Sequence, residues 1–208
     1  MTFTNPWLNI PLKDYERHMS HHLVGQSSLL NSLTKKYLDE IKPERAIFLG
    51  ISGGNGLEHI DKNITQSVYG IDINPDYLNT TFTRYKNTIP SLQLLNLDLV
   101  KNTECICKAD FVWAALVLEY TGIDKSFEFC TNNMSKGGHL IVSIQSNNSK
   151  QSISPTGIES VKRAGDVFSI VHPENLLIKA VEKGFILIEK EENALPNGKS
   201  IITFHFVT

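Results

Sequence analysis

Short apolar runs alternate with longer stretches of helical periodicity through most of this chain, and that alternation constrains the fold more than any other feature. The runs have the length and composition of buried strands and span residues 45–49, 68–73, 92–97, 110–115 and 140–144. Parallel strands need long crossover connections, which are usually helices. The alternation therefore predicts an α/β fold in which helices cover a mainly parallel sheet.

The beginning of the chain follows a different pattern. From Pro11 to Lys42, apolar residues recur at intervals of three and four, and Pro43 ends the pattern. This periodicity predicts a helical cap over residues 1–43. The remaining residues, 44–208, are then expected to form the α/β core of a single domain.

The end of the chain also departs from the alternation. Residues 185–189 and 201–206 alternate apolar and polar side chains on either side of the turn-forming sequence Leu195-Pro196-Asn197-Gly198. This pattern predicts an antiparallel hairpin. With the five earlier strands, the hairpin completes a Rossmann-like, seven-stranded mixed sheet whose last strand we expect to be antiparallel.

Composition and charge narrow the class of protein. The 208 residues are 41% hydrophobic and 20% charged, with a formal net charge of -2 and no basic cluster, so we expect no nucleic-acid partner. No apolar run is long enough to span a bilayer, and the first residues lack the basic start of a signal peptide. We therefore expect a cytoplasmic protein with no membrane partner. The cysteines, which form no paired motif, are expected to be reduced.

A loop of small residues follows the first predicted strand and leads into a predicted helix. Glycines tolerate positive φ and carry no Cβ, so backbone amides in such a loop approach a ligand closely at the helix N-terminus. A tight turn that binds nothing is the alternative interpretation. If the loop holds a nucleotide, its contacts are Gly50, Ser52, Gly53, Gly54, Asn55 and Gly56.

Acidic residues end the second and third predicted strands. Asp72 follows the loop at the spacing of about 20 residues at which a carboxylate binds ribose hydroxyls. Its alternative role is to cap the helix that starts at Pro75. Asp98 is placed to accept a hydrogen bond from an adenine amino group between apolar walls at Leu97 and Leu99, with a solvated surface carboxylate as the alternative.

In this order, the motifs resemble those of the class I S-adenosylmethionine-dependent methyltransferases, whose first motif reads roughly acidic-x-Gly-x-Gly-x-Gly. Residues 50–56 align with that motif, Asp72 and Asp98 follow strands two and three, and residues 110–120 resemble the fourth motif. The resemblance covers residues 43–208. It implies S-adenosylmethionine as cofactor and S-adenosylhomocysteine as product. It also adds three nucleotide contacts: Ile73, Ala115 and Leu116.

Two positions depart from the family pattern. Gly50 stands where the family has an acidic residue, and Ser52 replaces the first glycine of the loop. The usual acidic contribution to positioning the methionine end of the donor is therefore missing. We expect the serine hydroxyl or another acidic side chain to compensate.

Other nucleotide-binding classes fit the loop less well. A nicotinamide dehydrogenase needs Gly-x-Gly-x-x-Gly, but counting from Gly54 places His59 where the third glycine belongs. Aminopropyltransferases, which use decarboxylated S-adenosylmethionine, have a similar glycine run but carry a catalytic aspartate just after strand four. Here residues 114–118 are uncharged, although Glu119 is near. The aminopropyltransferase and a non-catalytic binding protein remain alternatives.

Methyl transfer from a sulfonium mainly requires alignment of donor and acceptor and exclusion of water. An acceptor that carries a proton also needs a base. The catalytic candidates are Tyr15, His18, Tyr120 and His172, and Glu119 is a further candidate base. The alternative is that the N-terminal candidates pack on the sheet or remain solvated.

Few residues outside the expected core are available to recognise a substrate. Only the cap and residues 146–175 lie outside the expected core, so we expect a small-molecule acceptor. Met19 and Gln26 share the cap with the catalytic candidates Tyr15 and His18. The histidines at 18, 21 and 22 have no carboxylate at matching spacing, so we expect no metal site.

Overall fold

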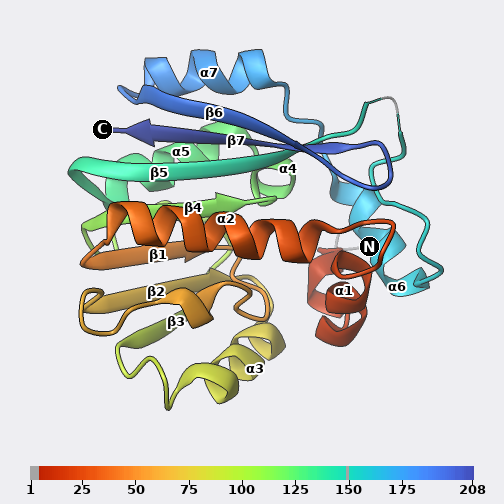
Figure 1. The fold of residues 1–208 in the computed structure, drawn as a ribbon, viewed down its shortest axis with the longest axis horizontal. Helices are drawn as coiled ribbons and strands as arrows, with labels where there is room; N and C mark the ends of the chain where they lie inside the picture. The colour runs from red at the N-terminus through yellow and green to blue at the C-terminus, as the bar shows by residue number, and fades with distance from the viewer. Residues whose placement is uncertain (1–4, 149) are drawn as a thin grey trace.

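The computed structural model describes residues 5–148 and 150–208. Its centre is a seven-stranded sheet of order β3-β2-β1-β4-β5-β7-β6 (Figure 1). The strands are β1 (Arg45–Leu49), β2 (Ser67–Asp72), β3 (Leu92–Asn96), β4 (Ala109–Ala115), β5 (Met134–Ser146), β6 (Ile186–Ala194) and β7 (Ser200–Val207). β7 pairs antiparallel with both β5 and β6, whereas the pairs from β3 to β5 are parallel. The predicted fold class is confirmed.

Helices lie on both faces of this sheet. The α-helices are α1 (Leu12–Met19), α2 (Gln26–Ile41), α3 (Pro75–Tyr85), α4 (Leu118–Thr121), α5 (Ile123–Asn133), α6 (Glu159–Lys162) and α7 (Pro173–Glu182). Three 3-10 turns complete the set: η1 (Pro6–Asn9), η2 (Leu57–His59) and η3 (Arg163–Val167). α2 crosses the sheet over β1 and β4, while α5 lies behind it (Figure 1).

Each face of the sheet has its own apolar core because successive strand side chains point to opposite sides. In β1, Phe48 packs toward α2 with Trp113, whereas Ile47 and Leu49 belong to the cluster beneath α5 and α7. Burial on both faces explains why the central strands are continuous apolar runs in the sequence.

The helical cap predicted from Pro11 to Lys42 is present, but it consists of two helices rather than one uninterrupted stretch. The structure breaks it into α1 and α2 at residues 20–25, where Gly25 adopts a φ of +67°. A Cβ at Gly25 would press on the ring of Pro196, so the turn also depends on a close approach. The break lets α1 fold away from the sheet face toward the carboxyl ends of the strands (Figure 1).

The helix predicted after the glycine loop is wrong. Residues 57–59 form only the single turn η2. α2 occupies this side of the loop instead: Asn31 donates hydrogen bonds to Asn55 and Glu58, and Gly56 lies directly against Thr34. The loop therefore has no α-helix behind it, and the helix-dipole argument for binding an anion there does not apply.

Smaller boundaries shifted as well. β5 begins at Met134 and ends at Ser146, so it is longer at both ends than the predicted run of residues 140–144, and it includes Gly137 with a φ of +75°. Within the described part of the chain, no helix is long and apolar enough to cross a membrane.

Candidate nucleotide and acceptor site

Three adjoining cavities lie at the carboxyl ends of the central strands. The first, which we call the main cleft, has an empty volume of about 690 Å³ that includes its open mouth. The inner pocket, of about 440 Å³, and the loop pocket, of about 620 Å³, adjoin it. Tyr15 of α1 lines all three, so the cavities meet beneath the N-terminal cap.

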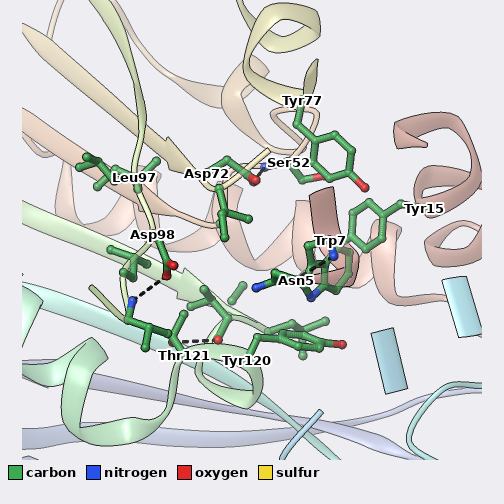
Figure 2. Close-up of a pocket in the computed structure, with 18 residues that line it drawn as sticks. Asn5, Trp7, Tyr15, Ser52, Asp72, Tyr77, Leu97, Asp98, Tyr120 and Thr121 are labelled. Carbon is green, nitrogen blue, oxygen red and sulfur yellow. Dashed lines mark hydrogen bonds between the residues drawn. The ribbon is translucent and has the colours of Figure 1, made fainter. Parts of the chain in front are cut away.

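The main cleft brings together most of the predicted nucleotide contacts. They come from the ends of four strands, as a parallel sheet requires of a ligand-binding edge. The predicted residues that line it are Gly50, Ser52, Asp72, Ile73, Leu97, Asp98, Leu99, Ala115 and Leu116. Figure 2 shows Asp72 and Asp98 along one side of this cleft, with Trp7, Tyr15 and Tyr120 gathered at the other.

Asp72 ties two of these strand ends together. One carboxylate oxygen accepts a hydrogen bond from the Ser52 amide at 2.8 Å, and the other accepts one from the Asn74 amide at 2.9 Å. Burial raises the pKa of this carboxyl, while the backbone hydrogen bonds oppose that shift. Asp72 does not cap α3; Asn74 does, through the amides of Asp76 and Tyr77. Each carboxylate oxygen of Asp72 keeps a lone pair for a further donor.

Asp98 lies in the loop that follows β3 and is half-buried. One of its oxygens accepts the Val100 amide at 3.0 Å, and the other pairs with Lys101 at 3.0 Å. Leu97 and Leu99 line the cleft on either side of it, as expected for apolar walls around a flat ring.

Two of the four described non-glycine residues with positive φ line the main cleft. Ser52 and Leu116 have φ values of +51° and +54°, which side chains other than glycine rarely adopt. They follow β1 and β4, whose carboxyl ends are neighbours in the sheet. Such strain is most common at binding sites, where the surrounding structure holds a residue in an unfavourable conformation.

The remaining loop residues divide into two groups. Gly53 and Asn55 line the loop pocket, and an ion pair between Glu16 and Arg84 covers Gly53. Gly54 and Gly56 line neither the main cleft nor the loop pocket. A Cβ on Gly54 would overlap Tyr85, and one on Gly56 would overlap Thr34 of α2. These two glycines pack closely against other parts of the protein, and neither lines the cavities in which the other predicted contacts lie, so their contact with the nucleotide stays a prediction.

The N-terminal segment closes the cleft in a way that the sequence did not predict. Trp7 and Asn5 line the main cleft just ahead of α1. The segment is anchored to α3, because Asn74 donates to the Trp7 carbonyl at 2.8 Å and the Tyr77 hydroxyl donates to the Ile10 carbonyl at 2.8 Å. The only available signal was an aromatic residue ahead of the cap.

The inner pocket is lined by three of the four catalytic candidates predicted from the sequence. Tyr15, His18 and Tyr120 line it, together with Glu119. Burial is the first cause of every pKa shift here: it raises the pKa of both tyrosines and lowers the pKa of His18 to about 4. His18 is only 5% exposed, and its Nδ1 bonds with the Thr156 hydroxyl at 2.8 Å. The alternative of a solvated His18 is wrong.

His172 does not belong to the site. It is the N-cap residue of α7, is exposed, and lines none of the three cavities. The sequence placed it near the acceptor because it follows the variable stretch after β5. In the structure the segment between β5 and α7 contributes other residues to the inner pocket: Ser152, Ile153, Val161, Ala164 and Phe168.

The buried polar atoms that lack a partner point to these cavities. Among the described residues, three buried side-chain nitrogen or oxygen atoms have no hydrogen-bond partner: Trp7 Nε1, Ser52 Oγ and Glu119 Oε2. All three belong to residues that line the cavities. Buried polar groups are nearly always satisfied in native proteins, so these atoms are expected to meet polar groups of a ligand or ordered water within the cavities.

No protein-family model and no curated protein matches this chain. Solved structures do. The N-methyltransferase NodS from Bradyrhizobium japonicum WM9, in complex with S-adenosyl-L-homocysteine, has a TM-score of 0.66 at 13% identity over 99% of both chains. The S-adenosylmethionine-dependent methyltransferase from Mesorhizobium loti has a TM-score of 0.69 at 15% identity, covering 85% of this chain and 96% of that one.

The same architecture also carries other chemistry. The [4+2]-cyclase SpnF has a TM-score of 0.67 at 11% identity, covering 86% of this chain and 80% of its own. At such identities the likeness concerns the fold, and function must be argued from the site. The strand order, the antiparallel β7 and these neighbours together show that this chain has the fold of the class I S-adenosylmethionine-dependent methyltransferases.

Proposed function

We propose that this chain binds S-adenosylmethionine in the main cleft and transfers its methyl group to a small-molecule acceptor. The observation that carries the proposal is the placement of Asp72 and Asp98 at adjoining strand ends along one cleft, within a fold shared with structures that hold S-adenosylhomocysteine. The described site fits this donor from its adenosine half to its methionine half.

The adenosine half has the clearer set of partners. Asp72 has lone pairs available for the ribose hydroxyls. Asp98 and its flanking leucines offer an acceptor and apolar walls to the adenine ring. This assignment of roles stays a prediction until a complex is measured.

The methionine half would be held by the loop pocket, where the family's acidic residue is replaced by Gly50. Ser52 presents an unpaired hydroxyl there, and Glu16 is an acidic side chain on the same pocket wall. When bound, the donor supplies a methyl group already activated by the positive charge on sulfur. The chain itself has to bind, orient and exclude water.

One observation favours the aminopropyltransferase alternative as well. Glu119 is a buried carboxylate next to the main cleft, so a group able to deprotonate an amine is present after all. A non-catalytic binding protein would use the main cleft without the inner pocket. Both alternatives make measurable predictions.

The test is calorimetric titration with S-adenosylmethionine, S-adenosylhomocysteine and decarboxylated S-adenosylmethionine. We expect the first two to bind and the decarboxylated donor to bind less tightly. Preference for the decarboxylated donor would favour aminopropyl transfer, and no heat with any of them would contradict the proposal. Methyl-labelled donor offered with small amines, phenols, thiols and carboxylates then separates an enzyme from a binding protein.

A further inference from the structure

Glu119 is the least exposed acidic or basic side chain in the described part of the chain. It lies in the first turn of α4, is 1% exposed and lines the inner pocket. Its Oε1 accepts a hydrogen bond from the Gln145 amide at 2.7 Å, but its Oε2 has no partner among the described residues. A buried carboxylate oxygen without a partner is costly, so a ligand that donates a hydrogen bond or carries positive charge would be favoured here.

The pocket offers nothing that would attract an anion. Its described lining contains no lysine or arginine. His18, the imidazole that faces it from α1, is held neutral near pH 7 by a pKa lowered to about 4. The buried Lys199 is near enough for its charge to help lower the pKa of His18, but its ammonium donates to the Ser152 carbonyl at 2.7 Å and Lys199 is not part of the pocket lining. A carboxylate or phosphate acceptor would therefore meet Glu119 with no cation in the pocket wall to pair with it.

Aromatic rings form much of the remaining wall. Trp7 contacts Tyr15 and Tyr120 edge-on, with ring centroids 5.5 Å and 4.9 Å away, and Tyr120 contacts Phe168 at 5.7 Å. Ring faces attract organic cations through their quadrupole, and more strongly when water is excluded. The Ser169 amide donates to the Glu119 carbonyl at 2.8 Å, which fixes the segment carrying Phe168 against α4.

We propose that the inner pocket binds the methyl acceptor, that this acceptor is a small organic ammonium, and that Glu119 is its counter-ion and proton acceptor. The proposal rests on the function proposed above. Polar side chains hold the walls in place: Gln26 of α2 donates to Gln145 of β5 at 2.7 Å, and His18 binds Thr156. The pocket is thus formed before any ligand arrives.

The transfer step balances with the groups present. The ammonium gives one proton to Glu119 Oε2, which leaves a lone pair on nitrogen. That pair forms the new nitrogen–carbon bond as the carbon–sulfur bond of the donor breaks, and the electrons of the broken bond stay on sulfur. The products are a methylated ammonium and neutral S-adenosylhomocysteine, and the proton on Glu119 later passes to solvent.

Three ligands of equal size and different charge test this assignment: propylamine, 1-propanol and propionate. Their dissociation constants are measured by ligand-observed NMR on the full chain, with and without saturating S-adenosylhomocysteine. We expect the amine to bind at least about tenfold more tightly than the alcohol, as for a charge-assisted hydrogen bond, and propionate to bind least.

Glu119→Gln supplies the decisive variant because its amide oxygen can still accept from the Gln145 amide. We expect it to remove the preference for the amine while leaving S-adenosylhomocysteine affinity within about twofold. Glu40→Gln, at an exposed position of α2, is the matched control and should keep the preference.

Each other outcome is decisive as well. Equal binding of amine and alcohol, or an amine preference that survives in Glu119→Gln, would overturn the inference. A variant that loses S-adenosylhomocysteine instead of the amine would show that Glu119 holds the donor, which also overturns it. If S-adenosylhomocysteine fails to bind the wild-type chain, the proposed function fails, and the amine series without nucleotide still reports on the pocket.

Discussion

The main cleft and the inner pocket both contain buried carboxylates, but these differ in how many of their oxygens have a hydrogen-bond partner within the protein. In the main cleft, both oxygens of Asp72 accept backbone amides, and Asp98 has a backbone amide and a lysine. In the inner pocket, one oxygen of Glu119 has no partner. The first region is organised by its own hydrogen bonds, whereas the second is left incomplete for a ligand.

This difference suits the carboxylates of the main cleft to binding a ligand and Glu119 to taking part in the reaction. A carboxylate that is already hydrogen-bonded is rigid and suited to positioning a ligand. A buried carboxylate with an oxygen that lacks a hydrogen-bond partner is suited to accepting a proton, because burial raises its pKa toward neutrality. Variants of Glu119, Asp72 and Ser52 test whether the two regions differ in this way.

The largest effect is expected in turnover by Glu119→Gln. If Glu119 takes the proton of the acceptor, the variant should lose about 10²- to 10⁴-fold in kcat, the usual contribution of a general base. Burial raises the pKa of Glu119 to about 7, so wild-type kcat/KM should fall as the pH drops below that value. The groups that face it are Tyr15, Tyr120 and the neutral His18. An unchanged kcat, or a variant that keeps the acid limb, would remove Glu119 from the chemistry.

The next effect concerns folding stability without ligand. The pKa of Glu119 is raised from 4.5 to about 7 in the folded chain, so its own contribution to wild-type stability should become less favourable as the pH rises from about 4.5 to about 7. His18, whose pKa is lowered to about 4, contributes in the opposite direction but equally in wild type and variant, so the difference between the two chains isolates Glu119. Glu119→Gln lacks this loss and should be more stable than wild type at pH 8, by up to about 3 kcal/mol. Urea unfolding at pH 4 and pH 8 measures it. A variant less stable than wild type at pH 8 would mean that the carboxylate is satisfied in the free protein.

Asp72→Asn is expected to act on the donor instead. It removes the negative charge of a group that accepts a hydrogen bond from the Ser52 amide and would accept hydrogen bonds from the ribose hydroxyls. The free energy of S-adenosylhomocysteine binding should therefore weaken by about 1.5 to 3 kcal/mol in calorimetry. Asp76→Asn, exposed in the first turn of α3, is the control and should bind as wild type does. Equal affinities for both variants would place the nucleotide away from Asp72.

The smallest effect is expected at Ser52, where Ala and Gly separate two roles. Ser52→Ala removes the hydroxyl and should weaken S-adenosylhomocysteine by about 0.5 to 1.5 kcal/mol, as for a neutral hydrogen bond. Ser52→Gly should lose similar affinity but gain stability, because glycine adopts the φ of +51° without strain. If both variants bind as tightly as wild type, the unpaired Ser52 hydroxyl does not meet the donor.

Most residues that line the main cleft could be named from the sequence because the motifs that carry them follow one another along the chain. β1, the glycine loop, β2 and Asp72 are close in sequence, and a strand end followed by an acidic residue is a local signal. Gly54 and Gly56 carried that signal as well, yet they serve packing against α3 and α2. A glycine motif does not distinguish close approach to a ligand from close approach to a helix.

The inner pocket was harder to predict because its walls come from distant segments. Trp7, His18, Glu119, Gln145 and Phe168 meet only after α1 folds back over the strand ends. That fold-back depends on the break at Gly25, which the apolar periodicity did not reveal. Glu119 was recognised as a candidate base, but nothing in the sequence indicated that one of its oxygens would be left without a partner.

A crystal structure of the chain with S-adenosylhomocysteine is the direct test that the main cleft binds the donor and the inner pocket binds the acceptor. We expect adenine between Leu97 and Leu99, the ribose hydroxyls hydrogen-bonded to Asp72, and the sulfur facing the inner pocket at Glu119. A nucleotide bound outside the main cleft, or a sulfur turned away from Glu119, would contradict this assignment.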